Sequence, residues 1–269
     1  MEREERLKLY EAGIPVFPTP ERGIRALAQF FRFEAAPAAA PGPPKVAVPE
    51  ALTLLPAAEA AAMITKAGIP AAAAPLARDA DEAVALAAQF GYPVVLKIAS
   101  PDIAHKSEVG GVLVGLENDD EVRQGFDEMM AASKLFERVA DIYGVTVSPM
   151  AKPGGLEVIL GIITDPQYGP TLMFGLGGVN TEIYQDVAFC LLPADDAELA
   201  DLIKRIKGYP LLTGYRGQPR RDTEALLAVM KALAIFAGKH PELDQIELNP
   251  LLLYPKGLFA VDVRIFSRL

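Results

Sequence analysis

The sequence is poor in several residue types, and each shortage narrows what the chain can be. It holds one cysteine in 269 residues, Cys190, so no internal disulfide can form and the cytoplasm is the expected compartment. No stretch approaches the roughly 20 unbroken apolar residues of a membrane span. The start Met1–Arg6 also lacks the apolar segment of a secretory signal. The net charge of −9 lacks the cationic excess that nucleic-acid binding needs. We therefore expect neither a membrane nor nucleic acid as a partner.

Histidine is also scarce, and one of the two histidines stands in a position suited to chemistry. His105 lies in a polar loop between the apolar segments 94–98 and 112–116, and the loop ends in Gly110 and Gly111. A neutral imidazole can attack a phosphoryl group, and paired glycines let backbone N–H groups approach phosphate oxygens. A surface hairpin with a solvated histidine explains the same spacing equally well.

Helical and strand periodicities alternate from about residue 57 onward, which predicts an α+β fold. We divide the chain into a short strand and helix in residues 1–33, a linker rich in proline and alanine at 34–56, and a main domain at 57–269. The first part has too few elements for a core of its own. In the main domain we expect helices at 57–66, 81–90, 119–139, 194–206 and 222–237, and strands at 94–98, 112–116, 145–150, 156–161, 171–174, 187–192, 245–254 and 258–263.

Two charged side chains stand at strand ends, where a ligand could reach them. Lys97 closes an apolar strand, and nucleotide phosphates would offset the cost of burying its ammonium; a lysine that reaches solvent is the alternative. Glu157 opens the strand after a Pro-Gly-Gly turn and could accept a hydrogen bond from a ribose or orient Lys97. An ordinary edge-strand carboxylate explains it as well. The proline before Met150 could free backbone groups to read an adenine edge.

Three oxygen-bearing side chains near the C-terminus form a candidate metal set. Glu247 and Asn249 are two residues apart on one strand and therefore point to the same face. A hairpin would bring Asp262 of the next strand beside Asn249. Such a set suits Mg²⁺, which favours one or two carboxylates together with water and phosphate. The alternative is a polar hairpin face. His240 reads as a helix C-terminal residue without chemistry.

These motifs occur in one order along the chain, and their combination resembles a known family. The motifs are the strand that ends at Lys97, the loop His105–Val112, and the segments Gly154–Glu157, Phe174–Gly178 and Glu247–Leu251. Together, over about residues 57–267, they resemble the ATP-grasp portion of the NDP-forming acyl-CoA synthetases. That family includes the ADP-forming acetyl-CoA synthetases and is related to succinyl-CoA synthetase. Residues 1–33 resemble the last strand and helix of that family's flavodoxin-like CoA-ligase domain.

The resemblance implies a reaction and a role for each matching residue. The family interconverts acyl-CoA, ADP and phosphate with free acid, CoA and ATP through phosphohistidine, and His105 occupies the position of the histidine that relays phosphate to the nucleotide. The implied nucleotide-binding residues are Lys97, Gly110, Gly111, Met150 and Glu157, and the implied Mg²⁺ ligands are Glu247, Asn249 and Asp262.

The sequence also departs from the family pattern. The family's CoA-binding fold and its other histidine are missing, which implies a CoA-binding, alpha-type partner subunit. Cys190 and Ser148 stand where relatives often carry arginine and glutamine. We expect the nucleotide-binding subunit of an ADP-forming acid–CoA ligase. The alternatives are a stand-alone ATP-grasp carboxylate ligase and a truncated nucleotide-sensing module without turnover.

Overall fold

The computed structural model describes residues 16, 17, 20, 23, 24, 27, 52–100, 103, 106, 110–133, 141–178 and 186–268. The chain divides into two compact units, Met1–Pro43 and Pro44–Leu269. In the first unit, the expected strand at 13–17 and helix at 19–31 fall largely outside the described residues. All elements discussed below belong to the second unit.

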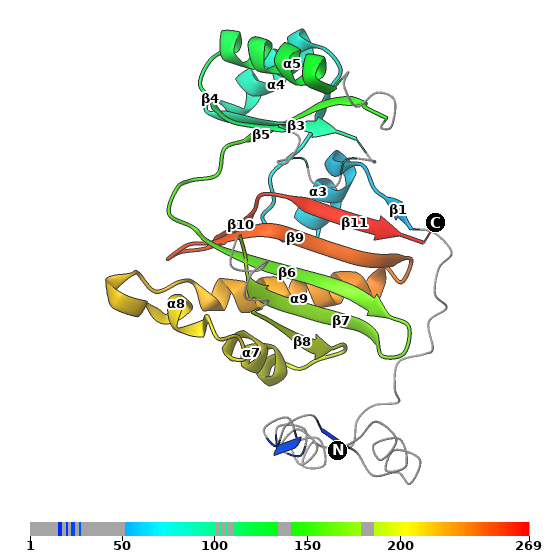
Figure 1. The fold of residues 1–269 in the computed structure, drawn as a ribbon, viewed down its shortest axis with the longest axis vertical. Coiled ribbons are helices and arrows are strands. Elements are labelled where there is room, and N and C mark those ends of the chain that lie inside the picture. Colours follow the sequence, from blue (N-terminus) through cyan, green and yellow to red (C-terminus); the bar gives the residue numbers. More distant parts are fainter. Residues whose placement is uncertain are drawn as a thin grey trace. The chain divides into compact units, whose positions relative to one another are not determined.

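A large antiparallel sheet forms the base of the second unit (Figure 1). Its strand order is β1-β11-β9-β6-β7-β8, and β10 pairs with β9. Because β1 pairs with β11, this domain's sheet already includes residues before position 57. The strands are β1 (Thr53–Leu54), β6 (Leu156–Asp165), β7 (Gly169–Leu176), β8 (Val187–Leu191), β9 (Leu243–Leu253), β10 (Leu258–Ala260) and β11 (Val263–Ser267).

Helices pack against this sheet and bury a hydrophobic core that includes Leu160, Phe174 and Leu248. They are α3 (Ala57–Lys66), α7 (Asp196–Lys204), α8 (Tyr209–Thr213) and α9 (Thr223–Lys239). Helix α3 contacts β11, α7 contacts β7 and β8, and α9 contacts β6. The sequence predicted all of them except α8, a single turn of five residues. Among the described residues, no helix has both the length and the apolar character needed to cross a bilayer.

A small sheet with the order β2-β5-β3-β4 carries two helices of its own. Its elements are β2 (Leu76–Ala77), α4 (Ala80–Phe90), β3 (Val94–Ala99), β4 (Val112–Leu116), α5 (Asp119–Ser133) and β5 (Gly144–Pro149). The expected extension of α5 to residue 139 lies outside the described part. Asp79 caps α4 by accepting from the N–H of Glu82 at 2.8 Å. Leu96 and Ile98 are buried in the core of this unit, so the intervening Lys97 points to the opposite face.

The last predicted strand, 258–263, is wrong as a single element. The structure has two strands there, β10 and β11, interrupted at Val261 and Asp262. The interruption lies opposite Asn249 and Pro250: Asn249 donates its N–H to the carbonyl of Asp262, and Val261 donates to that of Pro250. Proline has no N–H to donate to the ladder, so regular pairing stops at this point. The interruption leaves Asp262 outside any strand.

Candidate functional site

Lys97 connects the two sheets. Its Nζ donates to the carbonyl of Val261 at 3.1 Å and to Oδ1 of Asp262, also at 3.1 Å. The side chain of Lys97 is 13% exposed and that of Asp262 is 26% exposed, so the ion pair is partly shielded from water. Lys97 is therefore paired with a carboxylate of the chain itself, and its contact with nucleotide phosphates stays a prediction. Two roles were left open for Glu157: binding a ribose and orienting Lys97. Asp262 orients Lys97 in the structure, so only the ribose contact stays a prediction for Glu157.

The structure brings the three predicted metal ligands together. Asn249 Nδ2 donates to Glu247 Oε1 at 2.9 Å, which confirms that the two side chains share a face of β9. The backbone N–H of Asn249 donates to the carbonyl of Asp262 at 3.2 Å, so the expected proximity is also confirmed. The amide oxygen of Asn249 and one oxygen of Glu247 remain available to another partner.

Arg264 and Lys106 add positive charge around Asp262, and sequence reasoning missed both. Arg264 lies opposite Glu247 on β11, and its Nε is 3.9 Å from Asp262 Oδ2. Burial lowers the pKa of Lys106; Asp262 opposes this shift, whereas the positive charges of Lys97 and Arg264 reinforce it. Three cations thus surround one carboxylate, an arrangement that suits a polyanion. Lys106 directly follows His105 in the sequence, and this adjacency could have identified it as a candidate site residue.

The glycine loop is described only in part, because His105 lies outside the described residues. The N–H of Gly111 donates to the carbonyl of Lys106 at 2.7 Å, which closes the loop. A Cβ on Gly111 would lie 2.7 Å from Ile98 Cγ2, so a side chain does not fit there. Gly110 has a φ of +70° and open space around its Cα. The N–H of Gly111 is thus committed within the loop, and the nucleotide contacts of both glycines stay predictions.

Glu157 packs against the second glycine loop. Gly177 donates its N–H to the carbonyl of Glu157 at 2.8 Å. A Cβ on Gly177 would lie 2.9 Å from the carbonyl carbon of Glu157, and one on Gly178 would lie 2.6 Å from Oε2. The sequence Gly177-Gly178 is therefore needed for the close approach of Glu157, a reason that sequence reasoning did not find.

Met150 begins the connection between the two sheets. Its N–H donates to the carbonyl of Pro93 at 3.1 Å, and the residue is 44% exposed. The amide of Met150 is thus committed, whereas its side chain is accessible to a ligand. The side chain of Met150 and the peptide groups after it are therefore the groups that could contact a nucleotide base as predicted.

The two departures from the family pattern are both buried. Cys190 alternates along β8 with the exposed Phe189 and Leu191, so it faces the core beneath α7. Burial raises the pKa of its thiol. Ser148 is 4% exposed within β5. Cys190 therefore lies on the face of the large sheet opposite the one that carries Glu247.

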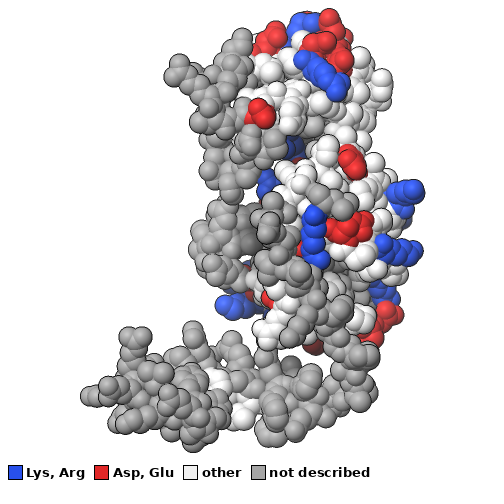
Figure 2. Space-filling view, turned by 90° about the vertical axis from the view of Figure 1, so that its right-hand side faces the viewer, with Lys and Arg blue, Asp and Glu red and all other residues white. Residues whose placement is uncertain are grey.

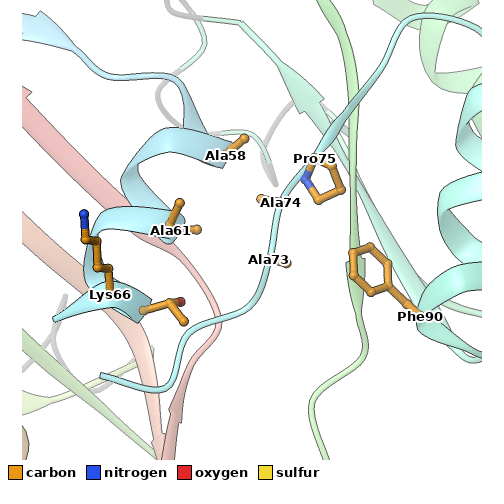
Figure 3. A pocket seen from close by; sticks show the side chains of 9 residues that line it. Ala58, Ala61, Lys66, Ala73, Ala74, Pro75 and Phe90 are labelled. Carbon is orange, nitrogen blue, oxygen red and sulfur yellow. The ribbon is translucent and has the colours of Figure 1, made fainter. Parts of the chain in front are cut away.

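A pocket of about 560 Å³ lies elsewhere, between α3 and the segment that leads into β2 (Figure 3). Alanine side chains, Pro75 and Phe90 form most of its wall, and none of the predicted site residues lines it. Its polar lining residues are Thr65 and Lys66, and neither a histidine nor a carboxylate lines it. The candidate site is instead the cluster around Lys97 and Asp262.

The donor chemistry of that cluster fits a hard cation. Within the described ranges, no three His, Cys, Asp or Glu side chains gather as a metal site would require. Glu247 and Asn249 share one face of β9, and the backbone of Asp262 is bonded to that of Asn249. The three side chains offer two carboxylates and one amide oxygen, a set that leaves positions for phosphate and water, as Mg²⁺ prefers. On the face in Figure 2, basic and acidic side chains are interspersed over the described residues.

Comparisons with known proteins agree with this geometry. The model of the ATP-grasp domain family matches residues 47–266. The beta subunit of acetate–CoA ligase [ADP-forming] I from Pyrococcus furiosus is 41% identical over 198 residues, which cover 74% of this chain and 85% of that protein. Acetyl-coenzyme A synthetase 1 of Ca. Korarchaeum cryptofilum, solved with coenzyme A and Ca-AMPCP, has a TM-score of 0.76 at 41% identity, covering 80% of this chain and 93% of that one.

A second structure of that synthetase contains coenzyme A and Mg-AMPPCP, with its phosphohistidine segment pointing towards the nucleotide binding site. It has a TM-score of 0.68 at 39% identity and covers 78% of this chain and 90% of that one. The chain belongs to the ATP-grasp family. Within that family it belongs with the beta subunits of the ADP-forming acetate–CoA ligases.

Proposed function

We propose that this chain is the nucleotide-binding subunit of an ADP-forming acid–CoA ligase, and that it exchanges a phosphoryl group between ATP or ADP and His105. The observation that carries the proposal is the contact of Lys97 with Asp262 beside Glu247 and Asn249. A partly buried ammonium beside carboxylate and amide oxygens supports the proposal, because phosphoryl transfer depends on cationic groups and a metal ion around the phosphates. The phosphohistidine segment of the Korarchaeum neighbour supports the part given to His105.

Each described side chain of the site has a task in this reaction. Lys97 and Lys106 bind phosphate oxygens, and Arg264 keeps Asp262 in position. Glu157 accepts from the ribose, and the segment after Met150 reads the base. Glu247, Asn249 and Asp262 would hold Mg²⁺, which neutralises negative charge on the phosphates when it is bound.

The transfer itself takes place at His105. In the direction of ATP use, an imidazole nitrogen forms a bond to the γ-phosphorus while the bond from that phosphorus to the bridging oxygen breaks, and ADP leaves. The phosphohistidine divides the overall reaction into two easier steps. In the reverse direction the same intermediate regenerates ATP.

The proposal includes a partner and a location. The Pyrococcus relative is named a subunit beta, and the Korarchaeum neighbour contains coenzyme A, so we propose a CoA-binding partner that carries its own histidine. The acid, CoA and phosphate would meet on that partner. Residues 1–33, as the remnant of a CoA-ligase domain, are proposed to join it. The single cysteine is the ground for a cytoplasmic location.

Labelling with γ-³²P-ATP and Mg²⁺ tests the proposal. The wild-type chain should acquire acid-labile label, because the P–N bond of phosphohistidine hydrolyses in acid. His105→Asn should lower labelling by at least ~10⁴, as loss of a nucleophile does. His240→Asn is the matched control, since His240 lies outside the loop, contacts Glu242 at 2.9 Å and packs at a tilt against the Phe236 ring.

Each other outcome selects a different function. Label that persists in His105→Asn contradicts the assignment of the nucleophile. Absence of protein label together with acyl phosphate formation identifies the stand-alone carboxylate ligase, and nucleotide binding without any transfer identifies a sensing module. Formation of acyl-CoA by the purified chain alone, at ordinary enzyme rates, contradicts the need for a partner.

A further inference from the structure

The segment Met150–Gly155 connects the small sheet to the large one, and we call it the connector. It leaves β5 at Pro149 and enters β6 at Leu156. Its first residue is tied to the small sheet through the N–H of Met150 and the carbonyl of Pro93, at 3.1 Å. Ala151 follows immediately, and its N–H and C=O form no hydrogen bond within the described part of the chain.

Two side chains from distant parts of the sequence hold the other half of the connector. Tyr254 Oη donates to the carbonyl of Lys152 at 2.7 Å. Arg221 Nη1 donates to the carbonyl of Gly154, also at 2.7 Å. The Tyr254 ring also lies against Gly155, where an added Cβ would come within 3.1 Å of Cε1. Both bonds fix backbone carbonyls, so they determine the path of the chain rather than the position of a side chain.

The two holding residues are themselves anchored by Asp222. Its N–H donates to the carbonyl of Tyr254 at 2.8 Å, and its Oδ2 accepts from the N–H of Gly257 at 2.7 Å. Its Oδ1 caps α9 by accepting from Ala225 at 2.9 Å. Asp222 thus joins the start of α9 to the end of β9. Arg221 and Tyr254, which we call the clamp, extend from this joined region toward the connector.

Polar groups are retained here at a cost. Arg221 Nε is buried, with no hydrogen-bond partner among the described residues. A buried donor without a partner is unfavourable, and apolar side chains of similar size would pack the same space without that cost. Unlike apolar side chains, the guanidinium of Arg221 and the phenol of Tyr254 form directional hydrogen bonds to the connector.

Tyr254 also links the connector to the metal-type residues. It directly follows β9, the strand that carries Glu247 and Asn249. Tyr254 lies five positions after Asn249, and five steps of extended strand correspond to about 17 Å. An extended nucleoside triphosphate can bridge such a span between its base and its terminal phosphate. The clamp therefore sets where the connector lies relative to the site of the phosphates.

We propose that Arg221 and Tyr254 are positioning residues that hold the peptide groups of Ala151 and Lys152 in register with the edge of a nucleotide base. The inference rests on the proposed function, because it names the support of that same site. It predicts that the clamp governs affinity for the nucleotide and leaves the rate of phosphoryl transfer at saturation unchanged.

The test compares Tyr254→Phe and Arg221→Lys with matched controls. Tyr168→Phe removes an exposed hydroxyl from the turn between β6 and β7. Arg205→Lys alters another arginine that donates to a backbone carbonyl, that of Phe189 at 3.0 Å. For each protein, calorimetry gives the Kd for Mg-ADP. Labelling with γ-³²P-ATP gives the half-saturating ATP concentration and the maximal rate, and thermal unfolding reports on folding.

We expect the Kd for Mg-ADP and the half-saturating ATP concentration to rise about three- to tenfold in both clamp variants, as the loss of one hydrogen bond predicts. The maximal labelling rate should stay within about twofold of wild type, and both controls should behave as wild type. Phenylalanine retains the ring contact with Gly155, so folding should be preserved. Arg221→Lys provides an independent measurement if Tyr254→Phe unfolds.

Three results would overturn the inference. The first is an unchanged Kd in both folded variants. The second is a maximal rate that falls as much as the affinity, which would indicate a general structural role. The third is an equal loss in the controls. If wild type binds Mg-ADP but is never labelled, the phosphohistidine proposal fails while the calorimetric test of the clamp stands. If wild type binds no nucleotide, both fail together.

Discussion

Replacing Lys97 with methionine separates the part of this residue in the fold from its part in binding. Methionine preserves most of the aliphatic stem and removes the ammonium, together with its bonds to Val261 and Asp262. The pair is only partly shielded, at 13% and 26% exposure, so its Coulomb energy is reduced by water. The substitution also removes the free-energy cost of desolvating the ammonium in the folded state. We therefore expect the free energy of unfolding to change by no more than about 1 kcal/mol.

The effect of Lys97→Met on nucleotide affinity should be much larger. A hydrogen bond to a charged group contributes about 1.5–3 kcal/mol, so loss of the lysine–phosphate contact should weaken Mg-ADP binding about 10- to 150-fold. Calorimetry with Mg-ADP measures the affinity, and urea unfolding of the same samples measures the stability.

The control for this substitution is Lys231→Met. Lys231 forms an ion pair of similar type with Asp196 at 2.7 Å, on α9 and α7 rather than between the sheets. It should leave nucleotide affinity unchanged. A folded Lys97→Met protein that binds Mg-ADP as tightly as wild type would refute the role of Lys97. A loss of several kcal/mol in stability would show instead that the pair mainly supports the fold.

Four further substitutions, together with one control, test other parts of the site and its support. Asn249→Ala and Asp262→Ala should each weaken nucleotide binding in the presence of Mg²⁺ more than in its absence, and an unchanged magnesium dependence would exclude them as ligands. Gly177→Ala should cost about 1–3 kcal/mol in urea unfolding, because the new Cβ would lie 2.9 Å from the backbone of Glu157. Gly238→Ala, where nothing lies within 4 Å, should cost nothing, and equal effects would refute the packing argument. Asp222→Ala should lower stability at pH 7 by about 1 kcal/mol, the contribution of a helix cap. Backbone N–H groups hold the pKa of Asp222 below its usual 3.8. Its contribution to stability is therefore present above pH 3.8 and is lost as the pH falls through the lower folded-state pKa. A stability difference between Asp222→Ala and wild type that does not narrow below about pH 4 would contradict this.

Local patterns predicted much of this structure. Helix α3 has the predicted bounds, and the bounds of α4, β3 and β4 differ from prediction by one residue or less. Period-two spacing placed Glu247 and Asn249 on one face, and their hydrogen bond confirms it. These features depend on residues close in sequence, so propensity and periodicity contain the necessary information.

Contacts between distant residues were beyond such patterns. The contact of Lys97 with Asp262 spans 165 positions, and the clamp of Tyr254 on Lys152 spans 102. The pairing of such residues depends on how the two sheets meet, which no local periodicity records. For the same reason the charges of Lys106 and Arg264 near Asp262 were not predicted. The part of His105 stays a prediction, since it lies outside the described residues.

The ion pair of Asp262 with Lys97, taken with the proposed binding of a cation by Asp262, has a consequence for how ligands bind. One carboxylate cannot give its full charge both to the Lys97 ammonium and to a divalent cation. A free cation that approaches alone must therefore compete with Lys97, and a phosphate that approaches alone must compete with Asp262. When the cation and the phosphate bind together as one complex, the Lys97 ammonium gains the phosphate as its counterion and the Asp262 carboxylate gains the cation. The coupling free energy between cation and phosphate is thus favourable, and by reciprocity each raises the affinity for the other. Under the proposed function, the ion pair would therefore favour binding of the metal–nucleotide complex over binding of the metal or the nucleotide alone.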